Sequence, residues 1–309
     1  MDRISTSQTY NSALLNLLSA GARQTEAQNQ VSTGKLADDL KGYGVHSDTL
    51  TGMKSFSTRL ESYTANAKIL STTLDVQDQI LGEASDATTG ARKAVADALS
   101  SGSADGLMSA LQGRMAQVLD VMNTQYQGRY LFSGGQTDTK PVQVSQLSDL
   151  TAAPSVASIF KNDQLTTSSR LDDNAVIPTG FLANDIGTDA MEAFKAVQAL
   201  HEGPDGPLAG KLTPTQVTQL TAMLSKFDTA FNTFNEATAV NGVQQNRVTS
   251  VQSSLEDRQT AVTGVLAGLT DVDMAEALSR LQLSQVAMQA SAQAFATLQG
   301  SSLLNALSR

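Results

Sequence analysis

The sequence predicts a mainly α-helical protein: an elongated coiled-coil helical bundle formed by both chain ends, with a small β-rich inserted domain between them. Two observations carry this prediction. Apolar residues recur at alternating spacings of three and four near both ends, and the pattern disappears in the middle. Composition agrees, because aromatic residues make up only 5% of the chain and Trp is absent. Helices that pack through small and medium side chains have this composition.

The strongest pattern runs from Met53 to Ala98, where twelve of fourteen positions at heptad spacing are apolar. No Pro lies between Ala20 and Ser100, so we expect one long helix from about Ser47 to Leu99. A heptad pattern of this length is typical of a coiled coil. The predicted rod core combines this stripe with one near the C-terminus: Met53, Phe56, Leu60, Tyr63, Leu70, Leu74, Leu81, Val248, Val251, Leu255 and Val262.

Glycines and turn residues delimit the other N-terminal elements. A weaker stripe predicts a separate helix over 5–33, and Gly34 ends it. The cluster 100–106 breaks the long helix, after which 3-4 spacing resumes at Leu107. This indicates an antiparallel return helix that Gly128 closes.

The middle of the chain changes character. Apolar and polar residues alternate over 141–144 and 156–160, and turn residues cluster at 172–174 and 178–180. This pattern favours short strands, so we predict a β-rich insert over 128–187.

Helices return after the insert. Asp189 is the expected N-cap of one helix, and Thr213 followed by Pro and by Gln216 is a strong start signal for the next. Asp271 to Asp273 restart a final helix. Its leucine-rich stripe leaves apolar side chains that need a cover, so we expect a subunit or chaperone interface made by Leu14, Leu17, Leu281, Met288, Phe295, Leu298, Leu303 and Leu304.

The expected organisation has five segments. Both ends carry heptads and the insert lies between them, so the N-terminal and C-terminal helices should pair. The segments are an N-terminal assembly segment (1–46), the N-terminal half of a coiled-coil rod (47–127), the β-rich inserted domain (128–187), the C-terminal half of the rod (188–269) and a C-terminal assembly helix (270–309).

Net charge and cysteine content exclude several classes of partner and site. The net charge is −9 without any Lys/Arg run, which argues against nucleic acid and against anionic membranes. The chain has no Cys, so disulfides and thiolate metal sites are excluded. No apolar run approaches the length of a transmembrane helix, and no signal peptide is evident, so export would occur without a cleaved signal.

No residue set suggests catalysis, a cofactor or a metal. His46 and His201 lie far apart without other ligands nearby, which favours ordinary surface or loop positions. Asp271, Asp273 and Glu276 lack the Gly and terminal Glu of a calcium loop, so helix capping explains them better. We therefore expect neither an enzyme nor a cofactor-binding protein.

Two sets of residues at opposite chain ends resemble the flagellin family. The C-terminal set is Asp271–Leu281, Gln285–Ala290 and Ser301–Asn305, and the N-terminal set is Arg3–Gln8 with Gln30–Lys35. They occur in the order that the family shows and cover about the first 130 and last 120 residues. The resemblance implies a coiled-coil subunit that is exported unfolded through the flagellar secretion channel and whose termini become ordered on assembly.

Within the family, Gly128–Gly135 and Thr137–Thr139 resemble the subunits at the junction between hook and filament. The implied location is extracellular, in the flagellum. The implied partners are further copies in a ring, the first hook-associated protein, flagellin and an export chaperone. Leu36–His46 departs from the family pattern, and a short flagellin stays the alternative. A free coiled-coil binding module, such as an adhesin or effector, is a second class, and a cytosolic enzyme has no supporting residue.

Overall fold

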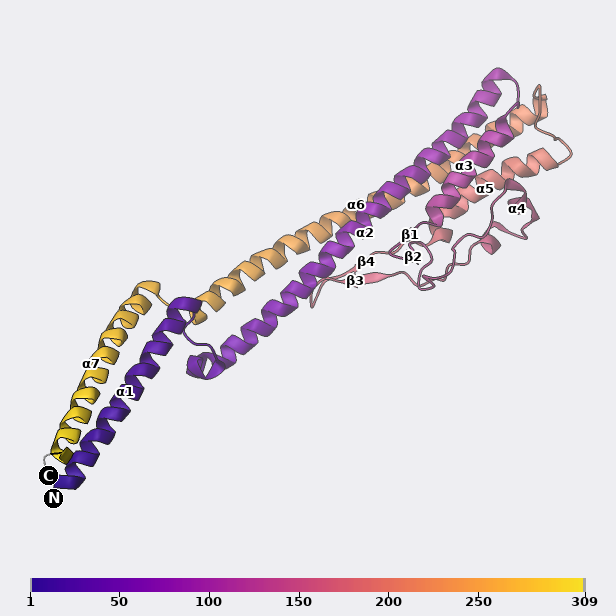
Figure 1. The fold of residues 1–309 in the computed structure, drawn as a ribbon. Coiled ribbons are helices and arrows are strands. Elements are labelled where there is room, and N and C mark those ends of the chain that lie inside the picture. The colour runs from indigo at the N-terminus through magenta and orange to yellow at the C-terminus, as the bar shows by residue number, and fades with distance from the viewer. Residues whose placement is uncertain (1, 308–309) are drawn as a thin grey trace. The chain divides into compact units, whose positions relative to one another are not determined.

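The computed structural model describes the backbone of residues 2–307 and the side chains of residues 8–299. This part of the chain is mainly helical with two small antiparallel sheets, as the sequence predicts (Figure 1). It divides into two compact units. Unit 1 joins the N-terminal segment up to Leu60 with the C-terminal segment from Asp257, and unit 2 is Glu61–Glu256. The five-segment organisation stays a prediction.

Helices account for most of the described residues, and the strands are very short. The helices are α1 (Asp2–Thr33), η1 (Leu40–His46), α2 (Ser47–Ser101), α3 (Leu107–Met122), α4 (Leu147–Ala152), η2 (Val156–Ile159), α5 (Ala183–Glu202), α6 (Pro214–Thr270) and α7 (Met274–Leu307). The antiparallel strand pairs are β1 (Gln125–Tyr126) with β2 (Arg129–Tyr130), and β3 (Ser168–Arg170) with β4 (Val176–Pro178).

The core of unit 2 is a helical bundle built on the α2 stripe. Every stripe position from Leu70 to Ala98 is buried, and α3, α5 and the first part of α6 supply the facing side chains. Phe194 of α5 meets Phe227 of α6 edge-on, with ring centroids 5.3 Å apart. Burial of these apolar faces is the main force that holds the four helices together.

Polar side chains link α2 to α6 within unit 2. The fully buried Asn241 donates from Nδ2 to the Leu74 carbonyl oxygen at 2.9 Å. Gln245 bonds Asp75 at 3.0 Å, and Ser85 bonds Asn235 at 3.1 Å. Later residues of α2 face earlier residues of α6, so the two helices run antiparallel.

Several predicted helix ends are confirmed. Gly34, with φ 68°, follows α1, and the break after α2 occurs at 102–106. At the start of α6, Thr213 and Gln216 form the reciprocal capping box: the Gln216 N–H donates to Thr213 Oγ1 at 3.2 Å, and the Thr213 N–H donates to Gln216 Oε1 at 3.0 Å. The return helix α3 ends earlier than expected, at Met122.

The strands of the insert lie elsewhere than the alternating segments predicted. Residues 156–159 form η2, and a single bridge between Val142 and Phe160 joins the two alternating segments. Four of their apolar side chains are buried without a ladder, because η2 packs on α5: Val142, Val156, Ile159 and Phe160. The predicted turn at 172–174 is confirmed between β3 and β4.

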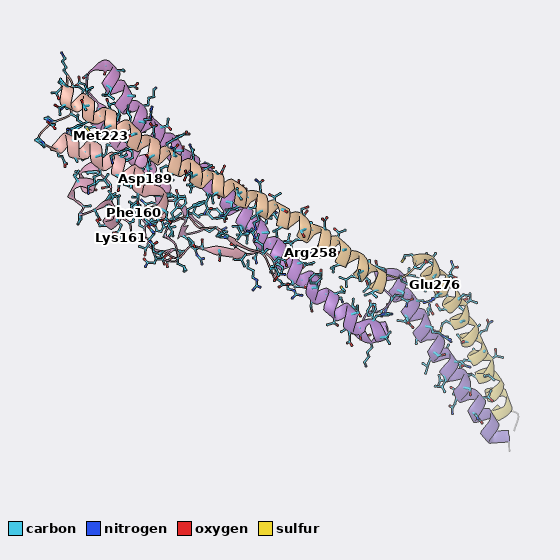
Figure 2. All side chains as sticks on the ribbon, turned by 180° about the vertical axis from the view of Figure 1, so that it is seen from behind. Phe160, Lys161, Asp189, Met223, Arg258 and Glu276 are labelled. Carbon is cyan, nitrogen blue, oxygen red and sulfur yellow. The ribbon has the colours of Figure 1, made fainter. Side chains whose placement is uncertain are left out.

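The start of α5 is a second correction. The helix begins at Ala183, whose N–H donates to the Phe132 carbonyl oxygen at 2.9 Å. Asp189, the predicted N-cap, lies inside the helix (Figure 2). Its Oδ2 accepts from Thr233 Oγ1 of α6 at 2.6 Å, so this carboxylate ties two helices together.

We predict that Phe194→Ala destabilises unit 2 strongly. The ring is fully buried against Phe227, and its loss should lower the free energy of unfolding by about 3–5 kcal/mol. Denaturant unfolding followed by circular dichroism measures the change. The control Val243→Ala, on an exposed α6 position, should stay within about 0.5 kcal/mol of the parent. Equal effects of the two substitutions would contradict this account of the core.

Candidate assembly site: the paired terminal helices

In unit 1, α1 and α7 lie side by side as an antiparallel pair (Figure 1). Tyr10 meets Phe295 with ring centroids 5.0 Å apart, and the backbone of Gly21 faces the end of Met288. Side chains at alternating spacings of three and four face the partner helix: Ala13, Leu17, Ala20, Gln24, Ala27 and Val31 on α1, and Ala277, Leu281, Ser284, Met288, Ser291, Phe295 and Leu298 on α7. We call this contact the seam.

Small residues let the two helices approach closely. Ala20, Ala27 and Ala277 are buried in the seam. A Cβ atom added to Gly21 would lie 3.8 Å from the Met288 Cε atom, which is ordinary contact distance. The pairing therefore depends on fitting small side chains against a few larger ones rather than on a broad leucine core.

The predicted interface residues lie at or beside this seam. Leu14, Leu17, Leu281, Met288, Phe295 and Leu298 are half-buried, on the sides of α1 and α7 that pair. Leu303 and Leu304 fall outside the side chains that the structure describes. A role for all eight in subunit or chaperone contacts stays a prediction.

The predicted rod-core residues are placed as follows. Seven of them are buried: Leu60, Leu70, Leu74, Leu81, Val248, Leu255 and Val262. Four are half-buried: Met53, Phe56, Tyr63 and Val251. Their assignment to a rod core stays a prediction.

A short backbone clasp joins the end of α1 to the link between α6 and α7. The Leu36 N–H donates to the Thr270 carbonyl oxygen at 2.7 Å, and the Val272 N–H donates to the Gly34 carbonyl oxygen at 3.0 Å. Between them, the Lys35 ammonium contacts Asp271 Oδ1 at 2.5 Å and Thr270 Oγ1 at 3.1 Å. We call residues 34–36 with 270–272 the clasp.

The clasp lowers the pKa of the Asp271 carboxyl group. The hydrogen bond from Lys35 lowers the pKa of Asp271 below its ordinary value, and the hydrogen bond from the Thr270 hydroxyl lowers it further. Both side chains of the ion pair are about half exposed, at 48% each, so water and salt screen the attraction. The backbone hydrogen bonds therefore fix the geometry, and the ion pair adds to it.

The acidic residues near the start of α7 have separate roles. Asp271 belongs to the clasp, whereas Asp273 accepts from the Ala275 N–H at 2.8 Å and caps the helix, as predicted. Glu276 pairs with Arg280 one turn later at 2.6 Å.

His201 Nδ1 accepts from the Leu208 N–H at 3.1 Å. Among the described residues, no three His, Asp or Glu side chains gather into a metal site.

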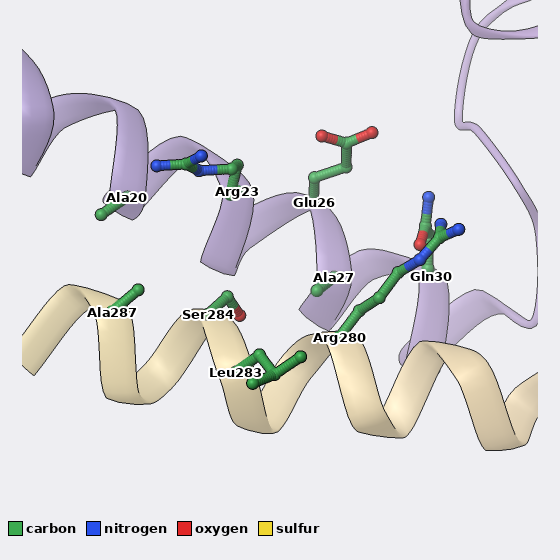
Figure 3. A pocket seen from close by; sticks show the side chains of 9 residues that line it. All are labelled: Ala20, Arg23, Glu26, Ala27, Gln30, Arg280, Leu283, Ser284 and Ala287. Atoms are coloured by element: carbon green, nitrogen blue, oxygen red, sulfur yellow. The ribbon is translucent and has the colours of Figure 1, made fainter.

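A groove of about 350 Å³ runs along one side of the helix pair (Figure 3). Small residues form its floor, and Arg23 and Arg280 lie at its rim. The lining residues are Ala20, Arg23, Glu26, Ala27, Gln30, Arg280, Leu283, Ser284 and Ala287.

Heptad reasoning missed the apolar side chains that point away from the seam. Leu15 and Leu18 on α1 are 66% and 61% exposed, and Leu283 and Val286 on α7 are similarly exposed. A different signal would have found this surface: residues 4–22 and 281–308 contain no Asp, Glu, Lys or Arg. At the chain's overall 17%, about eight charged residues would be expected there.

Over the described part of the chain, no helix has both the length and the hydropathy needed to span a bilayer.

The fold and this site define a helical structural protein whose two ends form one paired unit. Residues 4–137 match the bacterial flagellin N-terminal helical region, and residues 224–307 match the bacterial flagellin C-terminal helical region. These matches cover most of the chain, including all of α2 and α7 and most of α1 and α6. The chain belongs to the bacterial flagellin family.

Several individual relatives carry names of flagellar hook proteins. Over 97% of this chain and 98% of the relative, the sequence is 24% identical to flagellar hook-associated protein 3 of Escherichia coli K12. A putative flagellar hook-associated protein from Vibrio parahaemolyticus shares the fold with a TM-score of 0.61 at 19% identity, over 75% of this chain and 99% of that one. Bacillus cereus FlgL gives 0.56 at 14%, over 70% and 98%.

We predict that Asp271→Asn loosens the paired helices. The substitution removes the charge partner of Lys35, so amide hydrogen exchange at the end of α1 should become faster at pH 7. The control Glu276→Gln breaks an ion pair inside α7 that ties no second helix, and should leave α1 unchanged.

The pH dependence gives a second readout of the same substitution. Because the folded-state pKa of Asp271 is lowered, its contribution is present above the ordinary carboxylate pKa and is lost as the pH falls through the lowered value. The difference between the parent and Asp271→Asn should therefore vanish in acid. A difference that persists there would contradict the ion-pair explanation.

Proposed function

We propose that this chain is a structural subunit of the bacterial flagellum that joins the hook-associated ring to the filament. The observation that carries the proposal is similarity to flagellar hook-associated protein 3 along the whole of both chains. Membership of the flagellin family supports assembly through the terminal helices. In this proposal the chain is exported and has a structural role outside the cell.

The segment Gly128–Gly135 supports a junction subunit over a filament flagellin, because it makes structural contacts between the insert and α5. Phe132 is fully buried, and its carbonyl oxygen receives the first N–H of α5. The Gly135 N–H donates to Asp163 Oδ1 at 2.8 Å. A segment with these packing and hydrogen-bonding roles constrains its sequence, which makes its resemblance to junction subunits informative.

The exposed apolar surface of the α1–α7 pair supports contacts with other proteins. We propose contacts with further copies in a ring, with the first hook-associated protein and with flagellin after assembly, and with an export chaperone before it. Exposed leucines and the absence of charge favour burial, because each Å² of apolar surface removed from water contributes roughly 25 cal/mol. An amphipathic helix such as α7 also suits a chaperone groove.

A short flagellin that forms the filament itself is the second candidate. The matching family models describe flagellin helical regions, which both branches contain. The two roles differ in what is lost when the subunit is absent.

A deletion strain should separate these roles. If the chain is a junction subunit, cells without it should keep intact hooks and release flagellin monomers into the medium, because filament has no base on which to grow. Electron microscopy of hooks and immunoblots of the medium measure both effects, and the intact gene supplied in trans is the control. Loss of filament mass alone, with no released flagellin, would favour the short flagellin.

Removal of residues 271–309 should abolish assembly. It deletes α7 and the Asp271 half of the clasp, which leaves α1 without its partner. Unit 2 contains the insert and has its own core, so the circular dichroism signal of its helices should persist. The control is full-length Glu276→Gln, which should assemble normally. Normal assembly of the truncated chain would contradict the role of the terminal helices.

A further inference from the structure

We infer that neighbouring copies contact each other through two different surfaces. The exposed leucines of α1 in one copy enter the groove between α1 and α7 of the next. This inference rests on the proposed assembly function and specifies its contact. We call Leu15 and Leu18 the ridge. The ridge and the groove already described are the two complementary halves.

The groove can receive side chains because its floor is made of small residues. Ala20 and Ala27 on α1 and Ala287 on α7 lie where longer side chains would close it (Figure 3). Leu283 adds an apolar wall. A volume of about 350 Å³ is ample for two leucine side chains, and filling it would remove apolar surface on both partners from water.

The described residues of its own copy leave the ridge largely uncovered. Leu15 and Leu18 are spaced three residues apart, so they project as neighbours along one side of α1. They are 66% and 61% exposed, whereas the seam residue Ala20 nearby is buried. Their flanking side chains, Asn11, Ser12, Asn16 and Ser19, are polar but uncharged.

Ridge and groove occupy different parts of the surface of the same helix. Leu18 and the seam residue Ala27 are nine residues apart, about two and a half turns, so Leu18 projects away from the seam. Leu15 and Glu26 are eleven residues apart, about three turns, so the ridge adjoins the Glu26 edge of the groove. A reciprocal exchange of ridges across a two-fold axis would stop at the dimer, whereas the same contact repeated in one direction is heterologous and builds rings or filaments.

The charge pattern favours a second copy over other occupants. The ridge lies in one charge-free stretch, 4–22, and the α7 wall of the groove borders another, 281–308. A free surface in water normally carries charges, and an anionic membrane would require Lys or Arg around the ridge. A single chain that contains both halves of a matching contact has its simplest partner in another copy of itself.

Cysteine cross-linking in the full-length chain tests this contact directly, because the chain has no native Cys. Leu18→Cys and Ala287→Cys are made singly and together. Under mild oxidation at high protein concentration, the double variant should form a ladder of dimers, trimers and larger species. A mixture of the two single variants should stop at the heterodimer. Val45→Cys, 91% exposed and outside both surfaces, gives the background from random collision.

Two results would overturn the inference. A Leu18→Cys homodimer above the Val45→Cys background would mean that ridges meet each other across a two-fold axis. A double variant that cross-links no more than the background would mean that the ridge does not reach the groove.

Association measurements test the energetics separately. Leu18→Glu charges the ridge and Ala287→Leu fills the groove, and each should weaken self-association of the full chain at least tenfold in analytical ultracentrifugation. The matched controls are Val45→Glu and Ala296→Leu, which make the same changes outside both surfaces. Helix content by circular dichroism identifies any variant that fails to fold. Unchanged association in both folded variants would contradict the inference.

The outcome can be separated from that of the proposed function. Cross-linking reports which surfaces of two copies meet, whereas the deletion strain reports where the protein acts. A junction phenotype without ridge-to-groove cross-links would remove only this inference. Cross-links without a junction phenotype would leave the contact and remove the junction role.

Discussion

Pairing between helices from distant parts of the chain is the interaction on which the structure depends. Lys35 and Asp271 are 236 positions apart, yet they share the clasp. Leu74 and Asn241, 167 positions apart, share a buried hydrogen bond in unit 2. Closing loops of this length costs conformational entropy before any contact forms. Burial of apolar side chains between the paired helices must therefore supply the compensating free energy. The insert and the return helices lie within that long loop.

The two units use this pairing in different ways. In unit 2, α3 and α5 pack beside α2 and α6, so phenylalanine and leucine side chains are enclosed from several directions. In unit 1, the described residues of α1 and α7 pack chiefly on each other, and most of their large side chains are half-buried at best. A two-helix pair cannot enclose a core, since each helix presents more than half of its surface outward. In the proposed assembly, additional copies would supply this cover.

The sequence could predict the parts of this structure that depend on periodicity and local capping. The α2 stripe is visible because it repeats for many turns, and its two polar members are accommodated because Gln77 Nε2 donates to the Thr179 carbonyl oxygen and the Thr88 hydroxyl donates to the Ala84 carbonyl oxygen. The capping box at Thr213 and the cap at Asp273 depend on residues within a few positions of each other. In the two capping cases the interaction partners are neighbours in sequence.

The remaining features depend on contacts that no short segment contains. Strands of two or three residues are too short to alternate, and Asp189 resembles a cap although its partner is Thr233 on another helix. The candidate site has the same limitation. Heptad spacing identifies one apolar face per helix, which in α1 is occupied by α7. The second face, with Leu15 and Leu18, breaks the heptad and shows itself only through its exposure and its lack of charge. Folding of the single chain buries only the face of α1 that α7 covers. In the proposed assembly the second face would be buried as well.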